Sequence, residues 1–431
     1  EIKSIHGHDA FLIEFDQLTR ILEPVFKQPK TRSLKNRKLK VLKFGGRSLA
    51  NGEGLERVLD IITHKHREEE NFTVVLSARG GTTDALEQIL EKASRGEDYQ
   101  EDFEALKAYQ REPIADIDFE PEFSLLRDIF EGVKLLGDYS EKIKAQVMAQ
   151  GELMSVKLLA QLLRERGIEA EAVDSRKLLK TDESYGEGVI LQEVSKENVK
   201  RYFRKHGDRL QLVTGFIASN SRDETTTLGR NGSNYSASLF ANYLDAAELE
   251  SYTHVNGIYT ANPDMVPNAQ MIEELTYEEA NELANFGANI LHAKTIIPLI
   301  EKNIPLRLLN TFDTKNRGTL IKSHATKKGI RSVTVQKDVA LVNFEGRGLL
   351  GKIGVDARIF GSLGRAGISV SIISQGSSER GIGLAVSGSE AQRAQAVLEE
   401  EFAQDLKAKD VDRIFIKEDL AVVSVVGQNL S

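Results

Sequence analysis

The sequence predicts an α/β protein in which a mostly parallel sheet is covered by helices on both faces, followed by a smaller module of the order βαββαβ. Two observations favour this fold class. Short apolar strands alternate with amphipathic helices up to about residue 325, and a shorter strand–helix pattern follows them. In a parallel sheet the functional side chains gather at the carboxyl ends of the strands.

The composition limits the class of protein. The chain has 431 residues, which corresponds to about three folding units. Lysine and arginine number 57 against 65 acidic residues, a net charge of −8, which argues against a broadly basic nucleic-acid binder. No apolar run approaches the roughly 18 residues of a membrane span. The chain contains no cysteine, which excludes thiolate chemistry and fits a cytoplasmic protein. We therefore expect neither a nucleic-acid nor a membrane partner.

The first predicted strand leads into a glycine-rich turn. Leu39–Phe44 is a compact apolar run, and Gly45–Ser48 follows it before a helical pattern begins. A strand, a glycine pair and a helix start can form a phosphate cradle, because bare backbone N–H groups and the helix dipole both favour an anion. Lys43 stands at the strand end, directed at this cradle. A tight strand–helix turn is the alternative, although an unpaired lysine in an apolar strand is costly.

The same pattern recurs twice in the following residues. Thr73–Ser77 is the second predicted strand, and a turn of sequence ARGGTT leads from it to a helix beginning at Asp84. Leu212–Ile217 is the third, and Ser233 is placed to cap a later helix. The signatures of P-loop nucleoside triphosphatases and of protein kinases are absent from the sequence, so we expect neither class.

Six motifs occur in the order in which aspartate kinases carry them. They are KFGGRS (Lys43–Ser48), VVLSARGGTTD (Val74–Asp84), GELMS (Gly151–Ser155), TTLGRNGSNYSA (Thr226–Ala237), NGIYTANPDMVPNA (Asn256–Ala269) and YEEANELANFGANILHAKTI (Tyr277–Ile296). Residues 39–325 therefore resemble this family, most of all the kinase portion of bifunctional aspartate kinase–homoserine dehydrogenases. The resemblance implies an amino-acid-kinase fold. It also implies transfer of the ATP γ-phosphate to the β-carboxylate of L-aspartate, the first step towards lysine, threonine and methionine.

The resemblance also implies roles for individual residues. Lys43 matches the catalytic lysine near the transferring phosphoryl group, Arg230 the arginine that holds the substrate α-carboxylate, and Glu152 the acid near the substrate amino group. Further matches are Ser77, Thr83, Ser233 and Asn234 on the substrate side, and Gly45, Gly46, Thr253, His254 and Tyr259 on the nucleotide side. ATP would bring Mg²⁺ held mainly by phosphates and water, so no metal site of the protein's own is expected.

These residue types suit the chemistry, although simpler interpretations exist. An aspartate carboxylate is ionised at neutral pH, so the transfer needs cations and N–H donors rather than a general base. Glu152 precedes an apolar helical pattern, and as an alternative it is a first-turn acid favoured by the helix dipole. Ser77 and Thr83 are alternatively turn residues with local hydrogen bonds.

Several positions depart from the family pattern. Arg47 stands where the family usually has threonine, Asn234 and His254 where it has aspartate, and Asn289 where it has lysine. Our hypothesis is that Arg47 supplies the positive charge missing at Asn289. Because several of these changes remove charge from the expected site, the alternative function is a catalytically weak, amino-acid-sensing module of a fusion enzyme. A kinase acting on glutamate or carbamate is a further alternative, against which the GELMS segment and the C-terminal region argue.

The C-terminal region, residues 326–431, shows a ferredoxin-like order of elements. The predicted strands and helices are Asp338–Glu345, Lys352–Arg365, Ile368–Ser374, Gly381–Ser387, Glu390–Phe402 and Val411–Ile416. A G-x-G-x-x-G run at 346–351 lacks the acid that a dinucleotide site places about 20 residues later. The region resembles ACT regulatory modules instead, and Leu420–Val426 resembles one strand of a second, truncated module. The resemblance implies a homodimer or homotetramer and a threonine or lysine effector, with Gly348, Gly351, Ser369 and Ser371 as candidate effector residues.

The N-terminal residues precede the kinase-like region. Residues 1–26 resemble the end of homoserine O-acetyltransferases, in which a Gly-His-Asp-Ala-Phe-Leu segment carries the triad histidine, here His8. No G-x-S-x-G nucleophile elbow accompanies it, so we expect a remnant of a larger fusion that includes homoserine dehydrogenase and possibly this acetyltransferase. Residues 27–38 are basic and predicted to form a solvated linker, with an anionic-surface or nucleic-acid tether as the alternative.

Overall fold

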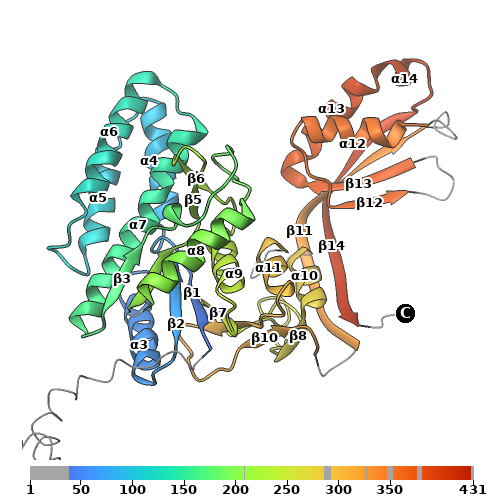
Figure 1. Cartoon of the computed structure of the whole chain (residues 1–431). Helices are drawn as coiled ribbons and strands as arrows, with labels where there is room; N and C mark the ends of the chain where they lie inside the picture. The colour runs from blue at the N-terminus through green and yellow to red at the C-terminus, as the bar shows by residue number, and fades with distance from the viewer. Residues whose placement is uncertain are drawn as a thin grey trace, which may run out of the picture. The chain divides into compact units, whose positions relative to one another are not determined.

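The computed structural model describes residues 38–207, 209–285, 293–325, 329–346, 353–375 and 381–428. The chain divides into two compact units, the first ending at His254 and the second beginning at Val255, and Figure 1 shows the elements of each. Several predictions fall on residues outside the described ranges. These are the N-terminal segments up to residue 37 with His8, as well as Asn289, Gly348 and Gly351.

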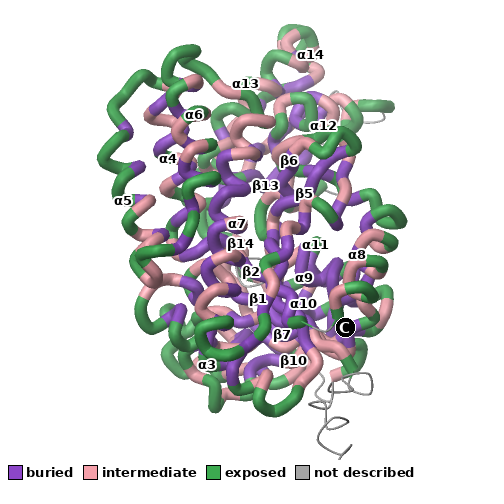
Figure 2. The backbone as a smooth tube through the Cα atoms, turned by 60° about the vertical axis from the view of Figure 1, so that its left-hand side comes forward, coloured by how far each residue is buried: buried purple, intermediate pink, exposed green. Residues whose placement is uncertain are grey.

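A parallel sheet forms the centre of the first unit, with the strand order β3-β4-β2-β1-β7. These strands are β1 (Lys40–Phe44), β2 (Phe72–Leu76), β3 (Ala170–Val173), β4 (Leu210–Thr214) and β7 (Glu248–Thr253). The interior of β1 and all of β2 are buried, as Figure 2 shows in purple, because helices cover the sheet. This explains why these strands are continuous apolar runs in the sequence.

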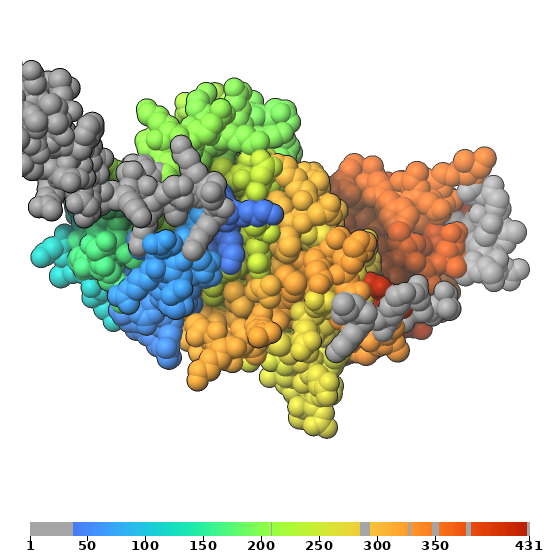
Figure 3. Space-filling view, turned by 60° about the horizontal axis from the view of Figure 1, so that its bottom comes forward, coloured from blue at the N-terminus to red at the C-terminus, as the bar shows by residue number. Residues whose placement is uncertain are grey.

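Helices cover both faces of this sheet. They are α3 (Glu53–Arg67), α4 (Thr82–Ser94), α5 (Gln100–Arg111), α6 (Glu120–Leu136), α7 (Glu141–Glu165), α8 (Gln192–His206) and α9 (Gly232–Tyr243), with η3 at Ser175–Lys177. Helix α7 packs on β2, β3 and β4, and α9 packs on β1 and β7. Helices α5 and α6 pack on α4, and α4 and α6 also pack on α7. The space-filling view shows the start of the described chain, with α3, as a blue surface (Figure 3).

Local structure in the first unit differs from the sequence prediction at three places. The predicted strand Leu212–Ile217 is divided into β4 and the short β5 (Ile217–Ser219), which pairs with β6 (Thr225–Thr227), because Phe216 adopts a left-handed φ of 66°. Helix α4 begins at Thr82, two residues before the predicted start. Ser233 does not cap α9. The N-cap is Asn231, with a φ of 59° and no side-chain cap bond.

The first part of the second unit contains short elements. They are β8 (Glu274–Thr276), α10 (Tyr277–Asn285), α11 (Ala293–Ile300), β9 (Leu306–Asn310) and β10 (Thr319–Lys322). β10 pairs parallel with β8 and antiparallel with β9.

An antiparallel sheet of order β12-β13-β11-β14 forms the second part of this unit and confirms the predicted βαββαβ order. Its elements are β11 (Gly329–Glu345), α12 (Val355–Arg365), β12 (Ile372–Gln375), β13 (Gly381–Ser387), η5 (Gly388–Glu390), α13 (Ala391–Glu401), α14 (Ala403–Lys407) and β14 (Arg413–Gln428). Phe344 and Phe402 meet edge to face in its core, with ring centroids 4.6 Å apart. The predicted strands Val411–Ile416, from residue 413 on, and Leu420–Val426 lie in one strand, β14.

No helix in the described ranges is long and apolar enough to cross a membrane.

Candidate functional site

A hollow of about 790 Å³ lies in the first unit beside the carboxyl ends of β1 and β2. The sequence-predicted residues that line it are Lys43, Gly46, Ser77, Thr83, Glu152, Arg230, Ser233 and Asn234. These residues come from strand β1, from turns and from helices, up to 191 positions apart in the chain, from Lys43 to Asn234. The fold thus brings together the residues expected on the substrate side and the expected catalytic lysine. Their individual roles stay predictions.

The two glycine-rich turns that follow β1 and β2 touch each other at this hollow. The Gly80 N–H donates to the Gly46 carbonyl at 2.9 Å. A Cβ on Gly46 would lie 2.9 Å from the Ala78 carbonyl oxygen, closer than real side chains approach, so this contact requires glycine. The turns therefore form one continuous wall rather than two independent loops.

Lys43 is a buried cation without a partner. It is 8% exposed, and no hydrogen bond or ion pair joins it to another described residue. Its Nζ lies 3.2 Å from the point where a Cβ on Gly45 would begin, so the ammonium group lies over the glycine pair. Burial lowers the pKa of Lys43 to about 8, because the low-dielectric surroundings disfavour its charged form.

Glu152 is a buried acid in the same hollow. It lies in the middle of α7, so the alternative of a first-turn acid is wrong. Its neighbour Gly151 lets α7 approach the turn after β2, since a Cβ there would lie 2.8 Å from the Ala78 Cβ. Glu152 Oε1 accepts from the Ala78 N–H at 3.2 Å, whereas Oε2 has no hydrogen-bond partner among the described residues. Burial raises the pKa of Glu152 to about 8.

These two groups make the hollow complementary to a ligand that carries both charges. An anion beside Lys43 would favour the ammonium form, and a cation beside Glu152 would favour the carboxylate. The exposed Arg230 lies on the turn before α9, whose first residues also line the hollow and offer backbone N–H groups at a helix N-terminus. The wall therefore presents a guanidinium, an ammonium and a carboxylate group.

Other predicted nucleotide residues lie outside the lining of this hollow. Arg47 Nη1 lies 2.9 Å from His254 Nε2, and Thr253 Oγ1 lies 3.3 Å from His254 Nδ1. An arginine can only donate, so His254 accepts through Nε2 and is neutral, with its proton on Nδ1. Burial and the nearby Arg47 charge both lower the pKa of His254. Tyr259 belongs to the second unit, where its carbonyl accepts from Ser332 Oγ at 2.9 Å.

Sequence reasoning missed several charged residues of the same hollow. Lys144 and Glu87 form an ion pair at 2.5 Å, and Asp84, Glu141 and Glu187 also belong to the lining. Charged residues on helix surfaces are common, and nothing in their local sequence marks these. The proximity of Asp84, Glu87, Glu141 and Lys144 depends on how α4 and α7 pack together, and Glu187 is held by its bridge to Leu228.

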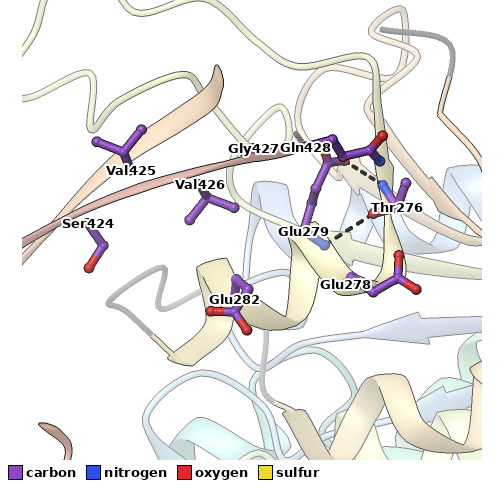
Figure 4. A pocket seen from close by; sticks show the side chains of 9 residues that line it. All are labelled: Thr276, Glu278, Glu279, Glu282, Ser424, Val425, Val426, Gly427 and Gln428. Carbon is purple, nitrogen blue, oxygen red and sulfur yellow. Dashed lines mark hydrogen bonds between the residues drawn. The ribbon is translucent and has the colours of Figure 1, made fainter. Parts of the chain in front are cut away.

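A second hollow, of about 330 Å³, lies within the second unit. Its lining consists of Thr276, Glu278, Glu279 and Glu282 around α10 together with residues 424–428 of β14, as Figure 4 shows. Glu279 Oε2 accepts from the Thr276 N–H at 2.8 Å, and Oε1 lies 3.6 Å from Arg331 Nε. The candidate effector residues Ser369 and Ser371 lie elsewhere, just before β12, where Ser371 Oγ donates to the Ala385 carbonyl at 3.1 Å.

Within the described part of the chain, no group of three or more histidine, aspartate or glutamate side chains is placed to hold a metal ion.

Comparison with protein families decides the classification. The model of the amino acid kinase family matches residues 38–310, more than half of the chain, and the ACT domain model matches 342–402. The chain belongs to the amino acid kinase family. Within that family it is an aspartokinase homologue, and the predicted amino-acid-kinase fold followed by an ACT module is confirmed.

The relatives of this aspartokinase homologue fall into two architectures. The bifunctional aspartokinase/homoserine dehydrogenase of Haemophilus influenzae is 33% identical over 91% of the chain, which covers 50% of that relative. The lysine-sensitive aspartokinase 3 of Escherichia coli is 30% identical over 91% of the chain and 87% of the relative. The crystal structure of E. coli aspartokinase III in complex with aspartate and ADP, at 30% identity, gives a TM-score of 0.77 over 91% of this chain and 88% of that one. The chain thus spans about half the length of the bifunctional relatives.

Proposed function

We propose that the chain is an aspartate kinase, which transfers the γ-phosphate of ATP to the β-carboxylate of L-aspartate and gives 4-phospho-L-aspartate and ADP. One observation carries this proposal. Lys43 and Glu152, both buried and without a charged partner among the described residues, line the same hollow as Arg230. The aspartate and ADP bound by E. coli aspartokinase III support the same assignment.

Each charged group of the hollow would bind a different part of the substrate. Arg230 would bind the α-carboxylate through its planar fork, and Glu152 would accept from the α-ammonium group. The β-carboxylate is then the free nucleophile and already carries its negative charge. Ser77, Thr83, Ser233 and Asn234 line the same wall and would supply hydroxyl and amide contacts.

The phosphoryl group would meet the wall at the two glycine turns. A β-carboxylate oxygen forms a bond to the γ-phosphorus, the bond to the bridging oxygen breaks, and ADP leaves with the electron pair, so no proton transfer is needed. Lys43 would stabilise the equatorial oxygens of the transferring group, with Gly45 and Gly46 beneath it. Mg²⁺ enters as part of the MgATP substrate. Thr253, His254 and Tyr259 are the proposed nucleotide contacts.

The regulatory assignment follows the same resemblance. We propose kinase and ACT regions at 39–325 and 326–431, a homodimer or homotetramer, and feedback by threonine or lysine at Gly348, Gly351, Ser369 and Ser371. A structure of E. coli aspartokinase III contains lysine and aspartate, which supports an amino-acid effector. We also propose that the chain is cytoplasmic and that Leu420–Val426 forms one strand of a second ACT module. As in the bifunctional relatives, we propose fusion to homoserine dehydrogenase, with homoserine O-acetyltransferase as a further fusion partner through residues 1–26 and the linker 27–38.

The test is ADP release from MgATP with and without L-aspartate, with hydroxylamine trapping the acyl phosphate. We expect aspartate-dependent turnover that Lys43→Ala abolishes and that Lys40→Ala, a change at the other end of the same strand, retains. A folded wild-type chain that binds MgATP but does not turn over would instead favour the amino-acid-sensing module. That alternative draws its support from the uncharged Asn234 in the hollow.

A further inference from the structure

Arg79, in the turn after β2, is a fully buried cation that forms no ion pair within the described residues, although the charge of the nearby Glu112 acts on it. Its exposure is 0%, and no ion pair joins it to a described carboxylate. Buried arginines normally pair with an acid, because an uncompensated buried charge is costly. Burial lowers the pKa of Arg79, consistent with that cost. A charge kept in such a place without a salt bridge calls for another explanation.

Neutral oxygens from two other elements hold the guanidinium group. Arg79 Nη1 donates to the Gln110 carbonyl at 3.2 Å, and Nη2 donates to the Tyr109 carbonyl at 3.1 Å and to Asn51 Oδ1. The guanidinium carbon also lies 5.1 Å from the centre of the Tyr109 ring. Both carbonyls belong to the last turn of α5, where the helix dipole is negative and favours a cation.

The same end of α5 also holds the backbone around Arg79. Gln110 Nε2 donates to Thr82 Oγ1 at 2.7 Å, and Thr82 Oγ1 donates to the Arg79 carbonyl at 2.6 Å. Gly80, with a left-handed φ of 50°, lies directly under the Tyr109 hydroxyl and leaves no room for a side chain. The end of α5 therefore holds the turn at three points, which are the Arg79 side chain, the Arg79 carbonyl and Gly80.

This fixed turn carries the aspartate side of the hollow. Ser77 and Thr83 flank it, and the Ala78 N–H bonds Glu152 Oε1 at 3.2 Å. Asn51, the third anchor of Arg79, belongs to the segment between β1 and α3, and its Nδ2 donates to the Tyr109 carbonyl at 3.0 Å. The turns after β1 and β2 thus share one anchor at the end of α5, outside the lining of the hollow.

We propose that Arg79 is a positioning residue, which locks the turn after β2 onto the end of α5 so that Glu152 and the Ala78 amide stay placed for the substrate ammonium group. This inference rests on the proposed function. Arginine is suited to the task because its fork bonds three oxygens in one plane, which a lysine does not reproduce.

The experiment compares Arg79→Lys, Arg79→Met and Gln110→Ala with wild type, with the exposed Arg95→Met as the matched control. Arg95 is the C-cap residue of α4. Its exposed side chain forms an ion pair with Glu91, its only ion-pair partner among the described residues. Kinetics are measured separately against aspartate and MgATP, and hydrogen exchange of residues 78–83 is followed in the same samples.

For Arg79→Met we expect kcat/KM for aspartate to fall about 30-fold, with KM for MgATP within about 2-fold of wild type and amide exchange in residues 78–83 about 10-fold faster. Arg79→Lys and Gln110→Ala should show the same pattern with smaller changes, and Arg95→Met none. A role in stability alone would lower the active fraction and leave both KM values unchanged, which would overturn the inference. Unchanged exchange in both Arg79→Lys and Gln110→Ala would overturn it even in a chain without kinase activity. Absent wild-type turnover would instead refute the proposed function.

Discussion

Strand β1 carries a lysine near each end, and the two lysines differ in whether an acid lies beside them. Lys40, at the amino end, lies 3.1 Å from Glu70 and 3.0 Å from Glu250. Burial alone would lower its pKa, but the two carboxylates outweigh burial and raise it. Lys43, at the carboxyl end, has no such partner among the described residues, and its pKa is lowered to about 8. Of these two lysines, three residues apart, the paired Lys40 is a structural charge, and the unpaired Lys43 is the proposed ligand-binding charge.

The contrast extends to the acids. Glu250 on β7 is 3% exposed and pairs with Lys40 and Lys65. Burial alone would raise the pKa of Glu250, but the two lysines outweigh burial and lower it. Glu152 is 2% exposed and retains an oxygen without a hydrogen-bond partner among the described residues. A buried charge that is paired indicates a role in stability, whereas an unpaired buried charge in a hollow indicates a candidate binding residue.

The largest effect should come from removing the unpaired lysine. Lys43→Met is expected to lower kcat by about 10³-fold or more, since it removes a cation aimed at the developing phosphoryl charge. Stability should stay equal or rise, because an uncompensated buried charge is replaced by an apolar side chain. ADP release and urea unfolding measure the two quantities. A variant that loses both activity and stability would show that Lys43 is a structural charge like Lys40.

Removing an acid from the paired lysines at the amino end of β1 should lower stability and leave kcat nearly unchanged. Glu250→Gln removes the carboxylate that lies 3.0 Å from both Lys40 and Lys65, and it leaves Glu70 as the remaining acidic partner of both lysines. We expect a loss of about 3 kcal/mol in the free energy of unfolding with kcat within about 3-fold of wild type. Urea unfolding at neutral pH measures the loss. An unchanged midpoint would show that the network contributes nothing to folding.

The pH dependence of stability sharpens the comparison for the acids. The folded-state pKa of Glu152, about 8, lies above its ordinary value of 4.5, so the folded chain binds the proton more tightly than the unfolded one. Its contribution is complete below about pH 4.5 and is lost as the pH rises to 8, by an amount on the order of a few kcal/mol.

Glu152→Gln should therefore reduce the fall in the free energy of unfolding between pH 5 and 8, whereas Glu250→Gln should not. The lowered pKa of Lys43 acts above pH 8, where stability recovers as the pH rises towards 10.5, so it does not mask the effect. Urea midpoints at pH 5, 6.5 and 8 test this. Parallel wild-type and Glu152→Gln curves would show that Glu152 does not titrate in this range.

The smallest effect concerns the exposed pair of Arg47 and His254. Arg47→Thr is expected to raise the KM for MgATP about 3- to 10-fold with little change in kcat, because an exposed charge is screened by solvent. The increase should shrink at high salt and should not be reproduced by Arg67→Thr on α3. If KM and kcat both stay unchanged, Arg47 has no role as the replacement for a charge at Asn289.

Local patterns predicted the parts of the fold that depend on local chemistry. Strands β1, β2 and β13 end within one residue of their predicted ends, because buried parallel or central strands are apolar runs bounded by glycine or polar residues. The break at Phe216 was not predictable, since a left-handed phenylalanine has no sequence signal. The true start of α7 was missed because its first turns contain small and polar residues, which hid the position of Glu152 within a long helix.

The candidate site divides in the same way. Lys43 and the glycine pair are visible in a short sequence window, and the remaining predicted residues were found through resemblance to a family. The anchors of Arg79 lie 28 to 31 positions away along the chain, so only the packing of α5 reveals them. The same holds for the pairing of Lys40 with Glu250, which are 210 positions apart.

The long pairing of β11 with β14 has a consequence for how the chain is made. Gly329 pairs with Gln428, and most of the second sheet separates the two strands in sequence. At about 5–20 residues per second, a ribosome adds Gln428 roughly 5–20 s after Gly329. During this time the nascent β11 has an unpaired edge, the kind of edge to which other chains add strands. Slow translation or weak chaperone cover should therefore lower the yield of this chain through aggregation at β11, before the first unit is affected.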